Sequence, residues 1–178
     1  TTTQVQYSLL DTRPEKSLVE LCGENDLHLL CYGTLAGGFL SDRWLGVTKA
    51  QAESSMLENR SLVKYRLMIE EAGGWDRFQS LLQTLRLIAD RHDVSLASVA
   101  CRWVLEQPRV AAVIIGARNR AHLHRYAELF RFSLQKQDLE QLNQVKQQMN
   151  VPPGDVFDLE RDKSGPHGSI MKYNLNED

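Results

Sequence analysis

The chain is organised around the stretch Val110–Tyr126, which reads VAAVIIGARNRAHLHRY. Its first six residues are small or β-branched, a pattern typical of a strand buried on both faces of a parallel sheet. Gly116 ends the apolar run, and an amphipathic pattern opens at Asn119, a favourable N-cap residue. These features predict a buried strand, a tight turn and a helix start. Backbone N–H groups at a helix start bind anions, so the two arginines beside them, Arg118 and Arg120, suggest a phosphate ligand.

Two further strands are predicted upstream. Residues 2–8 alternate and are rich in residues that favour strands, and residues 27–32 form a short apolar run. Between the two, the apolar residues of the range 18–22 share one helical face. A strand, a helix and a strand within about 30 residues form a βαβ unit, which implies parallel pairing with a right-handed crossover.

Helical patterns dominate the rest of the chain, with Ser95 as the N-cap of one of them. They cover approximately residues 62–72, 75–91, 96–106, 120–130 and 136–149. Alternating strands and helices indicate the α/β class. Three strands are few for a doubly wound sheet, and a complete barrel needs roughly 250 residues, so we expect a partial (β/α)8 TIM barrel. The periodicity ends at Pro152, which predicts a folded unit over residues 1–150 and a tail over residues 151–178.

The composition is that of an ordinary globular protein, because 42% of the 178 residues are hydrophobic and 25% are charged. A net charge of −2 gives no general attraction to nucleic acid or to an anionic membrane surface. No apolar run approaches the roughly 20 residues of a membrane span, and no signal-peptide pattern opens the chain. The three cysteines lack the C-x-x-C spacing of a metal site. We therefore expect a cytoplasmic protein with no metal, no nucleic-acid partner and no membrane partner.

Four segments together resemble the second half of an aldo-keto reductase. They are QVQYSLLD at residues 4–11, LCYGTLAGGFL at residues 30–40, WVLEQP at residues 103–108 and IIGARN at residues 114–119. The resemblance covers about residues 1–148 in order and spacing. It implies that the predicted strands are strands six, seven and eight of the barrel. It also implies reduction of aldehydes or ketones to alcohols with NADPH, or alternatively NADH, held without a Rossmann domain.

The resemblance assigns cofactor-binding residues as well. Gln4 corresponds to the residue that hydrogen-bonds the nicotinamide carboxamide, and Tyr32 to the aromatic residue that stacks on the nicotinamide ring. Two loops supply the remaining contacts: Leu35, Gly37 and Leu40 along the pyrophosphate, and Gly116, Ala117, Arg118 and His122 around the adenosine 2′-phosphate. Small residues let the backbone approach a phosphate, and a guanidinium binds it through two hydrogen bonds. Each assignment has an ordinary alternative. Tyr32 is then a tyrosine at the rim of the fold, Gln4 an inward polar residue of a strand, and Arg118 a solvated charge at a helix start.

No catalytic residue is assigned. The family's catalytic tyrosine, lysine, aspartate and histidine belong to the first half of the barrel, which is not in this sequence. The adjacent residues Lys64 and Tyr65 are not expected to replace them, because neighbours on a helix point about 100° apart and this pair ends no strand. The same holds for Lys172 and Tyr173. We therefore expect the chain alone to lack carbonyl reductase activity.

Three interpretations of the chain stay open. It is half of a reductase that binds a carbonyl substrate once an N-terminal half completes it, a non-catalytic dinucleotide-binding or regulatory protein, or a fragment without a role of its own. The sequence begins at Thr1 without a methionine and enters a strand pattern at once, so we expect a missing upstream segment. Open strand edges in such a half barrel favour self-association.

Overall fold

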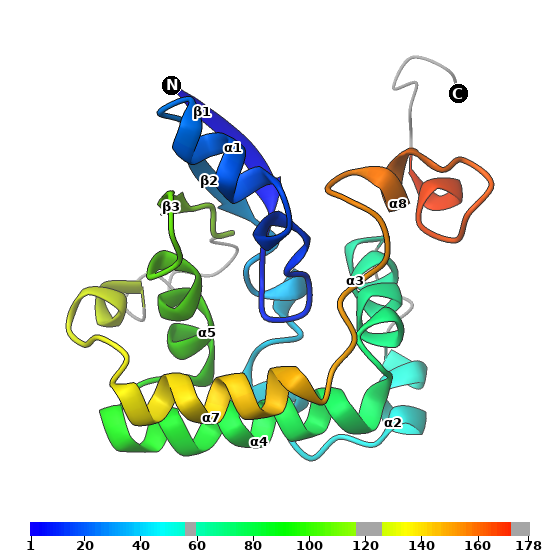
Figure 1. The fold of residues 1–178 in the computed structure, drawn as a ribbon. Helices are drawn as coiled ribbons and strands as arrows, with labels where there is room; N and C mark the ends of the chain where they lie inside the picture. Colours follow the sequence, from blue (N-terminus) through cyan, green and yellow to red (C-terminus); the bar gives the residue numbers. More distant parts are fainter. Residues whose placement is uncertain (56–59, 117–125, 172–178) are drawn as a thin grey trace.

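The computed structural model describes residues 1–55, 60–116 and 126–171, and in it a parallel sheet lies toward one side of the molecule (Figure 1). The sheet has the order β1-β2-β3 and consists of β1 (Thr2–Gln6), β2 (His28–Tyr32) and β3 (Val110–Val113). Both pairings are parallel, and the register places Gln4 opposite Leu30 and Gln6 opposite Tyr32. The three predicted strands and their parallel pairing are confirmed.

Helices follow the strands and form the larger part of the regular secondary structure (Figure 1). The α-helices are α1 (Leu18–Glu24), α2 (Lys49–Ser55), α3 (Arg60–Glu71), α4 (Trp75–His92), α5 (Leu96–Leu105), α7 (Lys136–Gln147) and α8 (Asp158–Arg161). The predicted N-cap is confirmed, because Ser95 Oγ accepts a hydrogen bond from the Ser98 backbone N–H at 3.1 Å. Most of the helix predicted over residues 120–130 lies outside the described residues. In the described ranges, no helix has the length and apolar character needed to cross a membrane.

The sheet has one covered face and one open face. Val5, Leu29 and Cys31 point to the helices and are completely or almost completely buried, whereas Gln4 on the opposite face is exposed. Alternation of side chains between the two faces explains this contrast. The prediction that the segment Val110–Ile115 is buried on both faces is wrong: Ile114 is 45% exposed, because no described element covers that face beside it.

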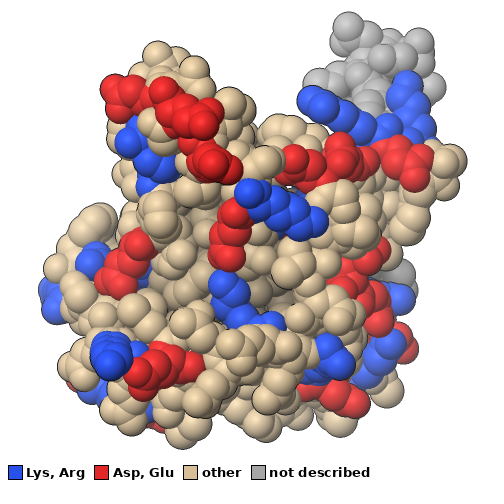
Figure 2. Space-filling model, viewed as in Figure 1, with Lys and Arg blue, Asp and Glu red and all other residues tan. Residues whose placement is uncertain are grey.

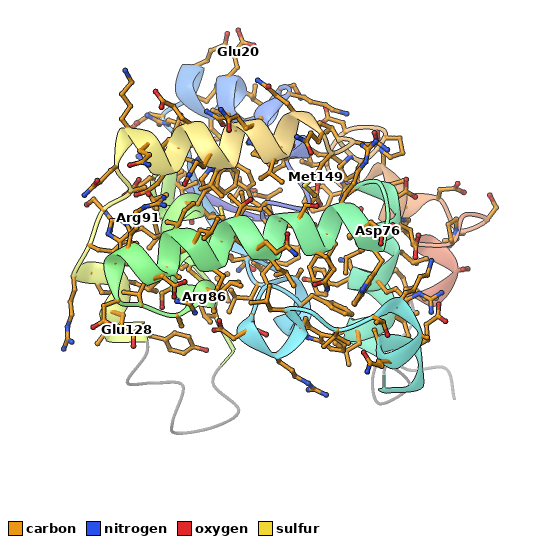
Figure 3. All side chains as sticks on the ribbon, turned by 90° about the horizontal axis from the view of Figure 1, so that it is seen from below. Glu20, Asp76, Arg86, Arg91, Glu128 and Met149 are labelled. Atoms are coloured by element: carbon orange, nitrogen blue, oxygen red, sulfur yellow. The ribbon has the colours of Figure 1, made fainter. Side chains whose placement is uncertain are left out.

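The core lies between the covered face of the sheet and a layer that contains α4 and α7. These two helices lie side by side and antiparallel, since Arg91 at the end of α4 pairs with Asp138 at the start of α7 (Figure 3). Four aromatic rings extend the core under the loop after β2, with centroid separations from 4.7 to 6.3 Å: Phe39, Trp44, Trp75 and Phe78. Leu40 of the same loop is also completely buried.

The C-terminal segment, defined here as residues 151–171, packs against the loop that follows β1. Lys16 Nζ donates to the carbonyl of Gly154 at 2.6 Å, and Ser17 Oγ donates to the carboxylate of Asp155 at 2.7 Å. The segment contains α8 and a 3-10 turn, Gly168–Ile170. It is therefore part of the folded surface near the carboxyl ends of the strands.

Candidate functional site

The carboxyl ends of β1 and β2 place Gln6 and Tyr32 next to each other, because the two residues are register partners. Active sites of parallel α/β barrels form at this end of the strands, from the loops that follow them. Here the loop after β1 carries Asp11 and Arg13, and the C-terminal segment lies across from it. The end of the sheet is therefore the candidate site.

A buried ion-pair network centred on Arg13 lines one side of this site. The Arg13 guanidinium is 1% exposed and donates from Nε and Nη2 to the two oxygens of Asp11, at 2.8 Å each. It also donates from Nη1 and Nη2 to the two oxygens of Glu160, at 3.2 and 3.1 Å, and from Nη1 to the carbonyl of Asp155 at 3.4 Å. All five N–H groups of the guanidinium thus have an acceptor.

Lys64 of α3 completes what we call the charged cluster: Asp11, Arg13, Lys64 and Glu160. Lys64 Nζ lies 3.6 Å from Glu160 Oε1 and 5.8 Å from the ring centroid of Tyr32. Its side chain is only 15% exposed, and burial lowers the pKa of Lys64 although Glu160 and Asp11 act in the opposite direction. The cluster contains two positive and two negative groups, so the buried charges offset each other.

Tyr32 is held as a neutral, partly buried ring. Burial raises the pKa of the Tyr32 phenol, and the nearby carboxylates of Glu160 and Asp11 raise it further. Burial alone would raise the pKa of Glu160, but the hydrogen bonds and charge of Arg13 outweigh it, and the pKa is lowered. At neutral pH the site therefore presents an uncharged aromatic ring beside ionised groups.

Tyr32 and Gln6 line a shallow depression that is open to solvent. The other lining residues are Val5, Arg13, Val156, Phe157 and Glu160. The depression encloses no volume of its own, whereas ligand pockets usually measure about 300 to 1,000 Å³, so the described residues supply one wall of a site rather than a closed pocket. The acidic and basic side chains on the face shown in Figure 2 are interspersed, without a basic patch. Among the described residues, no three His, Cys, Asp or Glu side chains are grouped as a metal site would require.

The structure places the predicted residues of β1 and β2 close to this depression. Tyr32 lines it directly, whereas Gln4 lies two residues before Gln6 on the open face of the sheet and is exposed. Gln6 is the side chain that sequence reasoning missed. Its Nε2 donates to Asp11 Oδ2 at 2.7 Å, while its buried Oε1 has no hydrogen-bond partner among the described residues.

Two glycines of the loop after β2 lie against Tyr65 of α3. Gly37 has a φ of +64°, and a Cβ atom there would lie 2.7 Å from Tyr65 Cδ2. Gly33 also has a positive φ and lies against the Tyr65 hydroxyl. The side chain of Leu40 is in the core and that of Leu35 is half-buried, so a ligand along this loop would meet mainly backbone.

The predicted phosphate site after β3 is described only at its two ends. Gly116 is exposed, and its carbonyl oxygen accepts a hydrogen bond from the Tyr126 hydroxyl at 2.6 Å. This bond ties the two ends of the loop together. Ala117, Arg118 and His122 lie outside the described residues, so their phosphate contacts stay predictions.

Comparison with solved structures places this geometry among aldo-keto reductases, whose fold is the TIM barrel. The glycerol dehydrogenase of Gluconobacter oxydans aligns with a TM-score of 0.63 at 20% identity, over 86% of this chain and 44% of that chain. An aldo-keto reductase from Klebsiella pneumoniae, solved in complex with NADPH, aligns with a TM-score of 0.53 at 18% identity, over 86% and 40%. These similarities show a shared fold.

Sequence comparisons also find aldo-keto reductases among the relatives of this chain. The chain is 30% identical over 106 residues to flagellar radial spoke protein 5 of Chlamydomonas reinhardtii, covering 60% of this chain and 20% of that protein. It is 24% identical over 157 residues to the aldo-keto reductase YhdN of Bacillus subtilis, covering 88% and 45%. The chain thus spans less than half the length of either relative. The aldo/keto reductase family model matches residues 1–147, which confirms the resemblance of the four sequence segments: the chain belongs to the aldo/keto reductase family.

Proposed function

We propose that this chain is the cofactor-binding half of an NADPH-dependent oxidoreductase that reduces aldehydes or ketones to alcohols. The observation that carries the proposal is the partly buried, neutral Tyr32 ring beside Gln6 at the carboxyl ends of two parallel strands. An aromatic ring at that place offers a flat face to a nicotinamide ring. The NADPH complex of the Klebsiella pneumoniae relative supports the choice of cofactor.

The residues present fit a nicotinamide dinucleotide. Gln6 Oε1 is a buried acceptor without a partner among the described residues, and it belongs to a side chain that lines the depression beside Tyr32. A buried polar atom of this kind is costly unless a ligand or water satisfies it, and a carboxamide N–H is a suitable donor. Tyr32 would hold the ring, and the backbone after β2 would lie along the phosphates. When bound, the cofactor supplies a hydride to the substrate.

We further propose that the chain forms strands six to eight of a barrel whose first half lies elsewhere. The sheet leaves one face open and pairs no described strand at the outer edges of β1 and β3. The chain's limited share of its relatives' length supports the same conclusion. The general acid that protonates the reduced carbonyl oxygen would then come from the first half.

Turnover by the purified chain tests this division of labour. We expect no NADPH-dependent reduction of a broad panel of aldehydes and ketones by the 178-residue chain, measured as absorbance loss at the NADPH band against a heat-denatured control. Turnover clearly above that control would contradict the proposal that the catalytic groups lie outside the chain.

A second candidate is a non-catalytic dinucleotide-binding or regulatory protein. The 30% identity to a protein named for the flagellar radial spoke favours it. This candidate predicts that the chain binds NADPH and that Arg118→Glu abolishes the binding. It also predicts no turnover when the first half of the barrel is supplied in trans. Restored turnover would select the reductase.

We also propose a cytoplasmic location. Cys22, Cys31 and Cys101 are free and buried, and burial raises the pKa of the Cys31 thiol to about 12. Unpaired thiols are typical of a reducing compartment. A fluorescent fusion of the complete gene product that localised to another compartment would contradict this assignment.

A further inference from the structure

The charged cluster sits directly beside the ring proposed to hold the nicotinamide. Lys64 Nζ is 5.8 Å from the centroid of Tyr32 and equally far from that of Tyr65, within the range of a cation–π contact. The negative charges of Glu160 and Asp11 add to the effect of burial and raise the pKa of the Tyr32 phenol. A positive charge thus lies 5.8 Å from the ring, and Glu160 lines the same depression as Tyr32.

The two cations of the cluster are compensated differently. The guanidinium of Arg13 donates two N–H groups to the carboxylate of Asp11 and two to that of Glu160. Its fifth N–H group donates to the backbone carbonyl of Asp155. Lys64, by contrast, pairs within the described part of the chain with Glu160 alone, at 3.6 Å. Because Glu160 already binds Arg13 through both oxygens, the ammonium of Lys64 keeps the least compensated positive charge of the cluster.

The two oxidation states of a nicotinamide differ by one charge at the ring. The oxidised ring is a cation, and the reduced ring is neutral. A positive group near the ring therefore weakens binding of the oxidised form relative to the reduced form, and a negative group does the reverse. In a partly buried site such a charge acts over several ångströms with little screening.

We propose that Lys64 and Glu160 form an opposed pair that sets the relative affinity of the site for the oxidised and reduced dinucleotide. Lys64 favours the reduced form, and Glu160, carried by the C-terminal segment, limits that preference. The inference rests on the proposed function, because it requires the nicotinamide to lie on Tyr32. The C-terminal segment, through Glu160, would thus influence which oxidation state of the cofactor the site prefers. Neither β1 nor β2 contributes a charged side chain to this pair.

The test uses charge-removing variants and the ratio of two dissociation constants, that of NADP⁺ divided by that of NADPH, measured by calorimetry at one ionic strength. Lys64→Met should lower the ratio about fivefold, because it leaves the cluster with one excess negative charge. Glu160→Gln should raise it by a similar factor, because it leaves one excess positive charge. The double variant should return the ratio close to that of the unchanged protein.

The ratio separates electrostatics from structural damage, since a misfolded fraction weakens both cofactors equally. The surface pair Lys49 and Glu70, 3.0 Å apart, provides matched controls: Lys49→Met and Glu70→Gln should leave the ratio unchanged. Ratios that stay constant in both cluster variants, or that move in the same direction, would overturn the inference while leaving the proposed function intact. No binding of either cofactor by the unchanged protein would overturn both.

Discussion

At the scale of single residues, the site depends on which glutamine of β1 faces the depression. Gln4 and Gln6 share the open face of the sheet, because they are two residues apart in a strand. Gln6 alone of the two lines the depression and keeps a buried, unpartnered oxygen. Family resemblance assigns Gln4 to the nicotinamide carboxamide, which stays a prediction, and the side-chain environment makes Gln6 a second candidate. The sequence could not distinguish them, because the difference depends on contacts with Asp11 and the C-terminal segment.

We expect Gln6→Leu to weaken NADPH binding by about tenfold, which corresponds to the loss of one hydrogen bond to a buried group. Binding of an analogue with an acetyl group in place of the carboxamide should already be weak and should change little in the variant, since the analogue lacks the N–H donor. Gln4→Leu is the matched control. A larger effect from the Gln4 variant would restore the assignment made by family resemblance.

At the scale of elements, two sets of charged contacts join segments that are far apart in the sequence. Arg13 and Glu160 join the loop after β1 to α8, across 147 positions. Asp138 joins the start of α7 to the end of α4 and accepts hydrogen bonds from Arg91 and His92. Local patterns predicted the strands, the long helices and the N-cap Ser95. They did not predict the packing of the C-terminal segment, because a buried ion pair leaves no periodic signal.

We expect Glu160→Ala to lower the free energy of unfolding by about 3 kcal/mol, because it leaves the buried Arg13 guanidinium without one of its two carboxylates. Urea denaturation followed by circular dichroism measures the change. Glu24→Ala, at the exposed end of α1, is the control and should stay within about 0.5 kcal/mol. Equal stability of the two variants would mean that the C-terminal segment does not depend on this ion pair.

Asp138 should make the packing of α4 against α7 dependent on pH. Burial would raise the pKa of Asp138, but the hydrogen bonds from Arg91, His92 and the Gln135 backbone outweigh it, and the pKa is lowered. A carboxyl with a lowered pKa in the folded state stabilises the protein above its unfolded pKa of about 3.9, and this contribution is lost as the pH falls through the folded value.

Asp138→Ala should therefore reduce the free energy of unfolding by about 3 kcal/mol at pH 7, and the deficit relative to the unchanged protein should shrink below about pH 4. Urea midpoints at both pH values measure it. The control is Glu140→Ala, on the same helix and exposed. A deficit that is the same at both pH values would show that the carboxylate charge contributes nothing to the packing.

At the scale of the whole molecule, the open sheet face is the main structural fact. The alternation of strands and helices predicted the α/β class, and the number of strands predicted an incomplete barrel. The exposure of Ile114 was not predicted, because a run of β-branched residues looks the same whether its second face is covered within the chain or by another part of a barrel. Within the described residues β3 is therefore only partly buried.

We expect the isolated chain to self-associate through its open sheet edges, since unpaired strands and exposed apolar side chains recruit a partner. Sedimentation velocity over a hundredfold range of concentration measures this. Ile114→Lys should shift the distribution toward monomer, and Leu87→Lys, an exposed apolar residue on α4, should not. A monomer at every concentration would contradict the expectation.

If Tyr32 forms the nicotinamide platform, calorimetric titration of NADPH into the protein should depend on its aromatic ring. We predict saturable binding at one site, nearly unchanged in Tyr32→Phe, which keeps the ring, and about tenfold weaker in Tyr32→Ala, which removes it. Absence of saturable binding, or equal affinities in all three proteins, would contradict the claim.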